Sequence, residues 1–332
     1  MKKLLFDLHT HTLVSGHAFS TLKENIEAAR DRGLWAMGTS DHSSSMPGAP
    51  DPIFFGNYKA VPDELFGVRI FTGMEANISD YDGHLDMDDA TLKKMDYVIA
   101  SLHVPCIDAG TRAENTDALI GAMQNPYVKI IGHPDDDRYP LDYPRLVQAA
   151  AKAKVALEVN SSSTSPRTGR RNADKNIPIF LALCQDYGVP VIVGSDAHIF
   201  SAVGDFATTE AMLTRCNFPE KLILNTSRDG LHYVLNETQR QLWYNISTKL
   251  CKDCDQRLQS FVVYWVYRNQ RGRKAYESYA AVTKRIFCRS TESFHCPCRT
   301  GWAVCDLPYA QSRAHVGAVI SQGTGVFAAG CE

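Results

Sequence analysis

Seven short apolar segments, most of them separated by stretches with helical character, mark the first two thirds of the chain. We predict strands at residues 4–8, 34–39, 68–72, 97–101, 128–131, 155–159 and 189–193. Helices are predicted after a capping-box pattern at Thr21 and Glu24 and from about Asn115, 145 and 177. Apolar strands that alternate with helices indicate a parallel sheet buried on both faces. This many units within residues 1–237 favours closure into an α/β barrel.

Histidines and carboxylates recur just after these strands. His9 and His11 lie two residues apart after the first strand, so on an extended chain their side chains point the same way. A His-x-His pair alone is a weak signal, because two surface histidines give the same pattern. The full set of candidate ligands is His9, His11, His17, His42, Glu75, His103, His133, Asp196 and His198. Loops that follow the strands of an α/β barrel converge on one face, so we expect one shared site there.

The size and chemistry of this set indicate a multinuclear metal site. Nine candidates exceed the four ligands that a tetrahedral zinc ion takes, which implies two or three metals bridged by a carboxylate such as Glu75. Imidazoles and carboxylates without thiolates suit zinc, manganese or iron in a catalytic site. Clustered cations activate water and bind phosphoryl oxygens, so we expect hydrolysis of a phosphate ester. Asp196, Glu75 and His198 are the predicted catalytic residues.

Several further residues have two interpretations each. Asp7 and Asp41 adjoin candidate ligands and are candidates to orient histidine rings, or they are ordinary strand-end residues. Arg167, in a loop with two other arginines, is the candidate substrate-binding residue because arginine pairs with phosphate; a solvated loop residue is the alternative. His84 lies among acidic residues, where a solvated turn is expected rather than a ligand.

Charge and cysteine content divide the chain near Glu237. Residues 1–237 hold 22 basic and 31 acidic residues, a net charge of −9, whereas residues 238–332 hold 13 and 6, a net charge of +7. Seven of the ten cysteines also lie after residue 237. We therefore predict one domain at 1–237 and a separate basic, cysteine-rich tail at 238–332. The acidic first part argues against a long nucleic-acid track, which needs basic residues.

The tail has three interpretations. Cys251-x-x-Cys254, with Cys296 and Cys298, suggests a zinc ribbon, but the second pair has the wrong spacing. The basic charge would suit nucleic acid, although no known motif arranges it. The third hypothesis is an accidental extension, such as out-of-frame translation, that packs poorly. No sustained helix or strand periodicity appears after Cys288.

The predicted location is cytoplasmic. No run of 18 apolar residues is present, so no membrane span is expected. The first residues reach Asp7 before a long apolar stretch forms, which is unlike a secretory signal.

Six motifs together resemble the PHP (polymerase and histidinol phosphatase) family, and within it the YcdX-like bacterial phosphatases. The resemblance covers about residues 4–236. It rests on Asp7-x-His9-x-His11, Thr39-Ser40-Asp41-His42, Gly73-Met74-Glu75-Ala76-Asn77, His103, Gly132-His133-Pro134 and Gly194-Ser195-Asp196-Ala197-His198. No position of the family's metal set is missing.

The resemblance implies a distorted seven-stranded barrel that holds three divalent metals, with zinc or manganese preferred. Carried over by position, the first metal takes His9, His11, Glu75 and Asp196; the second takes His17, His42 and His198; the third takes His103, His133 and Glu75. The implied activity is hydrolysis of small phosphomonoesters, and the branch suggests a homotrimer.

Other functions remain open at this point. Within the family, the alternatives are histidinol-phosphatase-like activity and a phosphodiesterase or nuclease. Outside it, they are a metal-binding module without turnover and an amidohydrolase, for which no bridging lysine is apparent. Fold membership alone does not fix the substrate.

Overall fold

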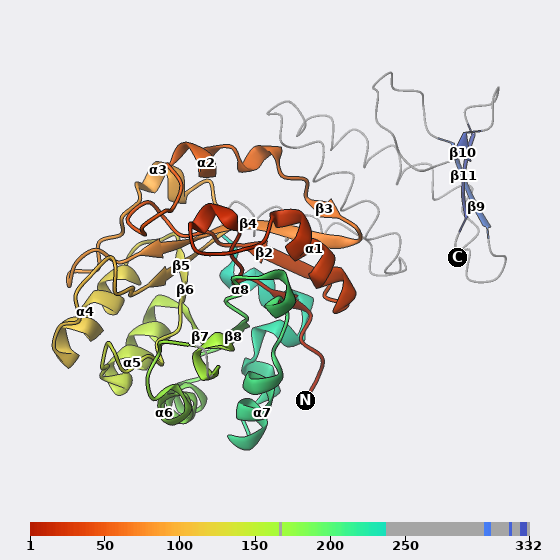
Figure 1. Ribbon diagram of the computed structural model, residues 1–332. Coiled ribbons are helices and arrows are strands. Elements are labelled where there is room, and N and C mark those ends of the chain that lie inside the picture. The colour runs from red at the N-terminus through yellow and green to blue at the C-terminus, as the bar shows by residue number, and fades with distance from the viewer. Residues whose placement is uncertain (166–167, 237–301, 307–318, 321–325, 331–332) are drawn as a thin grey trace. The chain divides into compact units, whose positions relative to one another are not determined.

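A nearly closed barrel of seven parallel strands forms the centre of the first part of the chain (Figure 1). The computed structural model describes residues 1–165, 168–236, 302–306, 319–320 and 326–330, and the chain divides into two compact units, Met1–Lys252 and Asp253–Glu332. The barrel strands, in order around the sheet, are β1 (Phe6–Asp7), β2 (Ala36–Thr39), β4 (Val68–Asn77), β5 (Tyr97–Ser101), β6 (Val128–Ile131), β7 (Ala156–Asn160) and β8 (Val191–Gly194). A short β3 (Glu64–Leu65) pairs antiparallel with β4. The predicted barrel and its seven strands are confirmed.

Helices follow most of the strands. They are α1 (Leu22–Asp31), α2 (Ile53–Gly56), α3 (Asp89–Leu92), α4 (Arg112–Ala122), α5 (Tyr143–Ala153), α6 (Ala173–Tyr187), α7 (Ala207–Arg215) and α8 (Leu231–Val234). Helices α4, α5 and α6 lie side by side along the outside of the barrel (Figure 1). Among the described residues, no helix has both the length and the apolar character that a membrane crossing requires.

Two helices start earlier than their sequence pattern predicts. The α1 capping box of Thr21 and Glu24 forms as predicted. A second capping box, of Thr111 and Glu114, starts α4 at Arg112 rather than near Asn115. Helix α6 starts at Ala173, four residues before its predicted start, and contains Pro178, which cannot donate the helical hydrogen bond to the carbonyl of residue 174.

The side chain of Asn225 joins the first and last strands of the barrel. Its Nδ2 donates hydrogen bonds to the carbonyls of Phe6 (2.8 Å) and Val193 (2.9 Å), and its Oδ1 accepts one from the Val193 N–H (2.7 Å). Further along, the chain bridges directly between Thr10 and Ala197. An amide side chain thus replaces strand-to-strand bonds where β1 and β8 do not pair.

Tyr97 fills the middle of the barrel. Its hydroxyl donates a hydrogen bond to the Leu8 carbonyl (2.6 Å), and the side chain is fully buried. Gly38 on β2 and Gly73 on β4 face the ring, and a methyl group at either position would collide with it. The two glycines are therefore what allows a large aromatic residue on β5.

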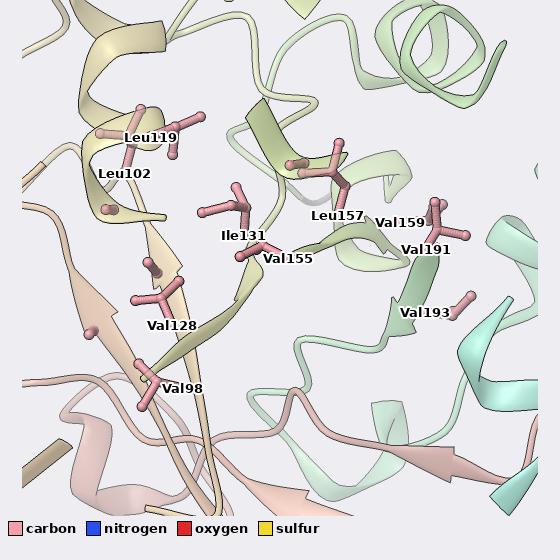
Figure 2. Close-up of a cluster of buried hydrophobic side chains, with 14 of the residues drawn as sticks. Val98, Leu102, Leu119, Val128, Ile131, Val155, Leu157, Val159, Val191 and Val193 are labelled. Atoms are coloured by element: carbon pink, nitrogen blue, oxygen red, sulfur yellow. The ribbon is translucent and has the colours of Figure 1, made fainter. Parts of the chain in front are cut away.

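A second layer of apolar residues lies between the barrel and its helices (Figure 2). Val98, Val128, Leu157 and Val191 of four successive strands belong to this cluster and are almost fully buried. Burial of each such side chain stabilises the fold by roughly 1.5–3 kcal/mol. Because the strands are covered on both faces, they read as continuous apolar runs in the sequence.

Helix α8 closes the barrel at the end opposite the carboxyl ends of the strands. Leu231, Val234 and Leu235 belong to the same buried cluster as Phe6 inside the barrel. Asn236 then donates from its backbone N–H to the Asp96 carbonyl, 2.8 Å away, just before β5.

The second unit contains a small antiparallel sheet in the order β10-β11-β9. Its strands are β9 (Trp302–Asp306), β10 (Val319–Ile320) and β11 (Val326–Gly330). These segments pair with one another although the sequence after Cys288 shows no sustained strand periodicity. Cys251, Cys254, Cys296 and Cys298 lie outside the described residues.

We predict that Asn225→Ala destabilises the first unit by about 2–4 kcal/mol, because it leaves three buried backbone groups without partners. Urea unfolding followed by circular dichroism measures this change. Asn57→Ala, at an exposed position, is the control and should change stability by less than about 0.5 kcal/mol. Equal stability of the two variants would mean that Asn225 is not needed for barrel closure.

Candidate metal centre

The barrel brings all nine predicted ligands to one end of the sheet. Glu75 lies within β4, and the others lie in the segments that follow β1, β2, β5, β6 and β8. Only His17 is exposed, while His103 and His198 are partly buried and the rest are buried. Residues far apart in the chain therefore meet at the mouth of the barrel, as the sequence analysis expects.

Glu75 lies at the centre of the cluster. Its Oε2 faces three ring nitrogens: Nε2 of His9 at 3.3 Å, Nε2 of His11 at 3.4 Å and Nδ1 of His42 at 2.9 Å. Burial alone would raise the pKa of Glu75, but the surrounding histidines hold it well below its usual value. Glu75 is therefore a carboxylate.

The other oxygen of Glu75 faces a different pair of rings. Nε2 of His103 lies 3.2 Å from Oε1, and Nε2 of His133 lies 3.0 Å from it. The Ser101 hydroxyl also donates to this oxygen at 2.7 Å. A carboxylate with ring nitrogens gathered at each oxygen has the arrangement of a bridging ligand.

The side chains of His9, His11, Glu75 and Asp196 fit a tetrahedral cation. The two Nε2 atoms lie 3.2–3.5 Å from Glu75 Oε2 and Asp196 Oδ1. Ligand atoms at the usual zinc distances in a tetrahedron lie about 3.3–3.6 Å apart. Among the described residues, Nε2 of His9, Nε2 of His11 and Glu75 Oε2 are buried without a hydrogen-bond partner. Buried polar atoms normally have partners, so a cation accounts for these three.

Three histidine rings form a second group at the more exposed side of the cluster. Nε2 of His17 lies 3.0 Å from Nε2 of His198. The His42 ring centre lies 5.0 Å from that of His17 and 6.0 Å from that of His198. Nδ1 of His42 also contacts Glu75 Oε2, so this ring lies between the second group and the bridging carboxylate.

Asp41 acts on His11 through a serine. The Ser15 hydroxyl donates to Asp41 Oδ1 (2.7 Å), so its oxygen is free to accept from Nδ1 of His11, 3.2 Å away. Because the ring proton is on Nδ1, Nε2 of His11 has a free lone pair. Burial and the neighbouring His198 and His42 keep the pKa of His11 well below its usual value, so the ring is neutral. Neutral imidazole is the form that binds a metal.

Asp7 binds backbone rather than a ring. Its carboxylate accepts from the N–H groups of His9 (3.2 Å), Ser195 (3.1 Å) and Gly204 (2.9 Å). The carboxylate therefore ties the loop after β1 to the loop after β8, and it acts on the ligands through their main chain.

The arginine that the structure places at the site is Arg170. Arg167 lies outside the described residues. Arg170 donates to Asp196 Oδ2 at 2.7 Å, and Asn160 donates to the same oxygen at 3.2 Å. Burial would raise the pKa of Asp196, but Arg170 and His9 hold it well below its usual range. One oxygen of Asp196 thus faces the histidines while the other is held by an arginine.

Three residues that position ligands were not predicted from the sequence. Asn77 Oδ1 lies 2.7 Å from Nδ1 of His103, and Glu158 Oε1 lies 2.6 Å from Nδ1 of His9. Glu158 and Asn160 are both on β7. A glutamate in the otherwise apolar segment 155–159 was the available signal, since an unpaired buried carboxylate is costly.

His84 lies on an exposed turn and pairs with Asp80 at 2.8 Å, as predicted. Outside the cluster around Glu75, the described residues contain one more group of potential metal ligands: Asp80, Asp82 and His84 on this turn. Hydrogen bonds within the group explain why these residues lie close together.

Comparison with known proteins identifies relatives over most of the chain. A probable phosphatase of Caldanaerobacter subterraneus subsp. tengcongensis is 45% identical over 241 residues, which is 72% of this chain and 94% of that protein. A probable phosphatase of Clostridium novyi is 41% identical over 229 residues, 69% of this chain and 93% of that protein.

Among solved structures, the histidinol phosphate phosphatase of Lactococcus lactis, complexed with zinc, L-histidinol and phosphate, matches with a TM-score of 0.47. The identity is 16%, over 65% of this chain and 95% of that chain. A likeness of this degree carries no conclusion about the substrate here.

Two domain families match within the first unit. The PHP domain matches residues 7–162, which include the ligands from His9 to His133, and the PHP-associated domain matches residues 181–216, which include Asp196 and His198. With the close relatives over most of their length, these matches show that the chain belongs to the PHP domain family.

Proposed function

We propose that this protein hydrolyses small phosphomonoesters at a site with three divalent cations. The observation that carries the proposal is the position of Glu75, with three ring nitrogens at one carboxylate oxygen and two at the other. The relatives named probable phosphatases support the reaction type.

The proposal keeps the three ligand groups that the resemblance implies, and the contacts around Glu75 support it. His9, His11, Glu75 and Asp196 would hold the first cation, and His103, His133 and Glu75 would hold the third. His17, His42 and His198 would hold the second. Divalent cations bound there would lower the pKa of a water molecule and neutralise charge on a phosphoryl group.

Glu75, Asp196 and His198 are the proposed catalytic residues. The carboxylates of Glu75 and Asp196 are ionised, so they supply the negative charge that balances cations in a buried site. His198 is the more accessible of the three, and the Asp196 carbonyl fixes its Nδ1 at 3.0 Å. Its Nε2 faces Nε2 of His17, 3.0 Å away, at the more exposed side of the cluster.

We propose that the loop with Arg167, Arg170 and Arg171 supplies the contact to the phosphate of the substrate. Arg170 is already paired with Asp196, so it orients that ligand. Arg167, three residues before it, remains the proposed substrate-binding residue because it lies in the same loop.

Exposed side chains near the ligands favour a small ester over a nucleic acid. Five exposed apolar residues lie within two positions of a candidate ligand: Leu13, Phe19, Val104, Ile199 and Phe200. A nucleic-acid track would place basic residues there instead. The net charge of −9 on residues 1–237 points the same way.

The remaining expectations are also part of the proposal. Zinc is the proposed metal, with manganese or iron as alternatives, and the assembly is a cytoplasmic homotrimer. The catalytic unit is residues 1–237, because the curated relatives match over 94% and 93% of their length but over only 72% and 69% of this chain.

Chelation should abolish phosphate release from a panel of phosphomonoesters that includes histidinol phosphate. His9→Ala and Asp196→Ala should each lower kcat/KM by more than about 100-fold, since loss of a ligand should exceed the effect of losing an outer partner. His84→Ala is the matched control and should keep full activity.

Elemental analysis of the purified protein should give close to three metals per chain. A fully metallated protein without activity on the panel would favour the metal-binding module.

A phosphomonoester should be a far better substrate than a single-stranded oligonucleotide of equal phosphate concentration. Comparison of the two at low salt, where electrostatic binding of nucleic acid is strongest, is the appropriate measurement. Faster cleavage of the oligonucleotide would replace the phosphatase proposal with a nuclease.

A further inference from the structure

Strand β7 (Ala156–Asn160) is the barrel strand that supplies none of the nine candidate ligands, yet its polar residues contact three of them. We infer that Glu158 is a positioning residue that holds a ligand of the first cation and a ligand of the third in place at the same time. This inference rests on the proposed metal site and adds the residue that organises it.

One oxygen of Glu158 fixes the ring of His9. Oε1 lies 2.6 Å from Nδ1 of His9, and both side chains are almost fully buried. A carboxylate accepts hydrogen bonds, so the ring proton lies on Nδ1. Nε2 then faces Glu75 Oε2 and Asp196 Oδ1, 3.3 and 3.5 Å away, where a bound cation would take its lone pair. A carboxylate behind a ligand histidine fixes its tautomer and raises its basicity.

The second oxygen of Glu158 fixes the backbone of His133. Oε2 accepts from the His133 N–H at 2.8 Å. His133 has a left-handed backbone with φ of 29°, an uncommon conformation for a residue with a side chain. This conformation presents Nε2 of His133 to Glu75 Oε1 at 3.0 Å. Glu158 therefore positions two ligands that lie at different oxygens of Glu75.

Asn160 carries the same network to a third ligand. Its Nδ2 donates to Glu158 Oε2 at 3.0 Å and to Asp196 Oδ2 at 3.2 Å. Gly194 makes room for the arrangement, because a methyl group there would collide with Glu158 Oε1. The carboxylate thus occupies space that a neighbouring strand leaves free.

Glu158→Gln tests whether the site needs a carboxylate here, because glutamine has nearly the same shape as glutamate but no charge. Three donors, from His9, His133 and Asn160, face the two oxygens of Glu158. Glu158→Gln offers one oxygen and places an NH₂ group against a donor. We expect it to fold but to bind zinc about 10–100-fold more weakly. Zinc affinity is measured by competition with a chromophoric chelator, and metal content by elemental analysis.

Two further readouts separate positioning from a general structural role. In the zinc-bound protein, proton NMR should detect the His9 Nδ1–H far downfield and protected from exchange, because it is hydrogen-bonded to the Glu158 carboxylate, and Glu158→Ala should lose both properties. At saturating zinc, Glu158→Gln should regain most of its kcat, because the residue does not touch the reacting group.

Asp96→Asn is the matched control. Asp96 is also buried and accepts two hydrogen bonds from Thr72, but it lies before β5, at the other end of the barrel. This variant should lower stability without changing zinc affinity. Wild-type zinc affinity in Glu158→Gln, or an unchanged His9 Nδ1–H signal in zinc-bound Glu158→Ala, would overturn the inference. If the wild type binds zinc but shows no phosphatase activity, the proposed function fails while these measurements still decide the role of Glu158.

Discussion

The arrangement of the side chains at the mouth of the barrel depends on one buried carboxylate. Glu75 is fully buried, and an isolated charge in that position would be very costly. Five histidine rings surround it, and four polar atoms in this group have no hydrogen-bond partner among the described residues. Rings and carboxylates alone therefore leave the site incompletely satisfied. The proposed cations would complete it, and any cation that binds only the folded chain also stabilises the fold.

The barrel interior and the metal centre are built by the same device. Glycine on one strand leaves space for a large or charged side chain on its neighbour. Gly38 and Gly73 make room for Tyr97 in the apolar part, and Gly194 makes room for Glu158 at the polar end. The barrel is thus packed along its length, and the transition from core to site changes only the polarity of the side chains that fill it.

Prediction from sequence worked where chemistry follows strand ends. The nine candidate ligands were recognised because imidazoles and carboxylates came directly after apolar segments, and parallel strands bring those positions together. Asp7 and Asp41 were recognised in the same way, but Glu158 and Asn77 gave no such signal. Glu158 lies in the middle of an apolar strand, and Asn77 was read only as part of a motif. Arg170 was not separable from Arg167, because the loop's conformation decides which arginine faces Asp196.

Backbone strain at two ligands explains why the supporting residues bind main chain as well as rings. His133 and Asp196 both have left-handed backbones, with φ of 29° and 53°. Such conformations cost free energy and persist only where the surroundings hold them. Glu158 accepts from the N–H of His133, and Asp7 accepts from the N–H of Ser195, directly before Asp196. Two buried carboxylates thus hold the backbone in the same way, one after β6 and one after β8. Residues of the chain itself therefore hold both the backbone and the rings of these candidate ligands.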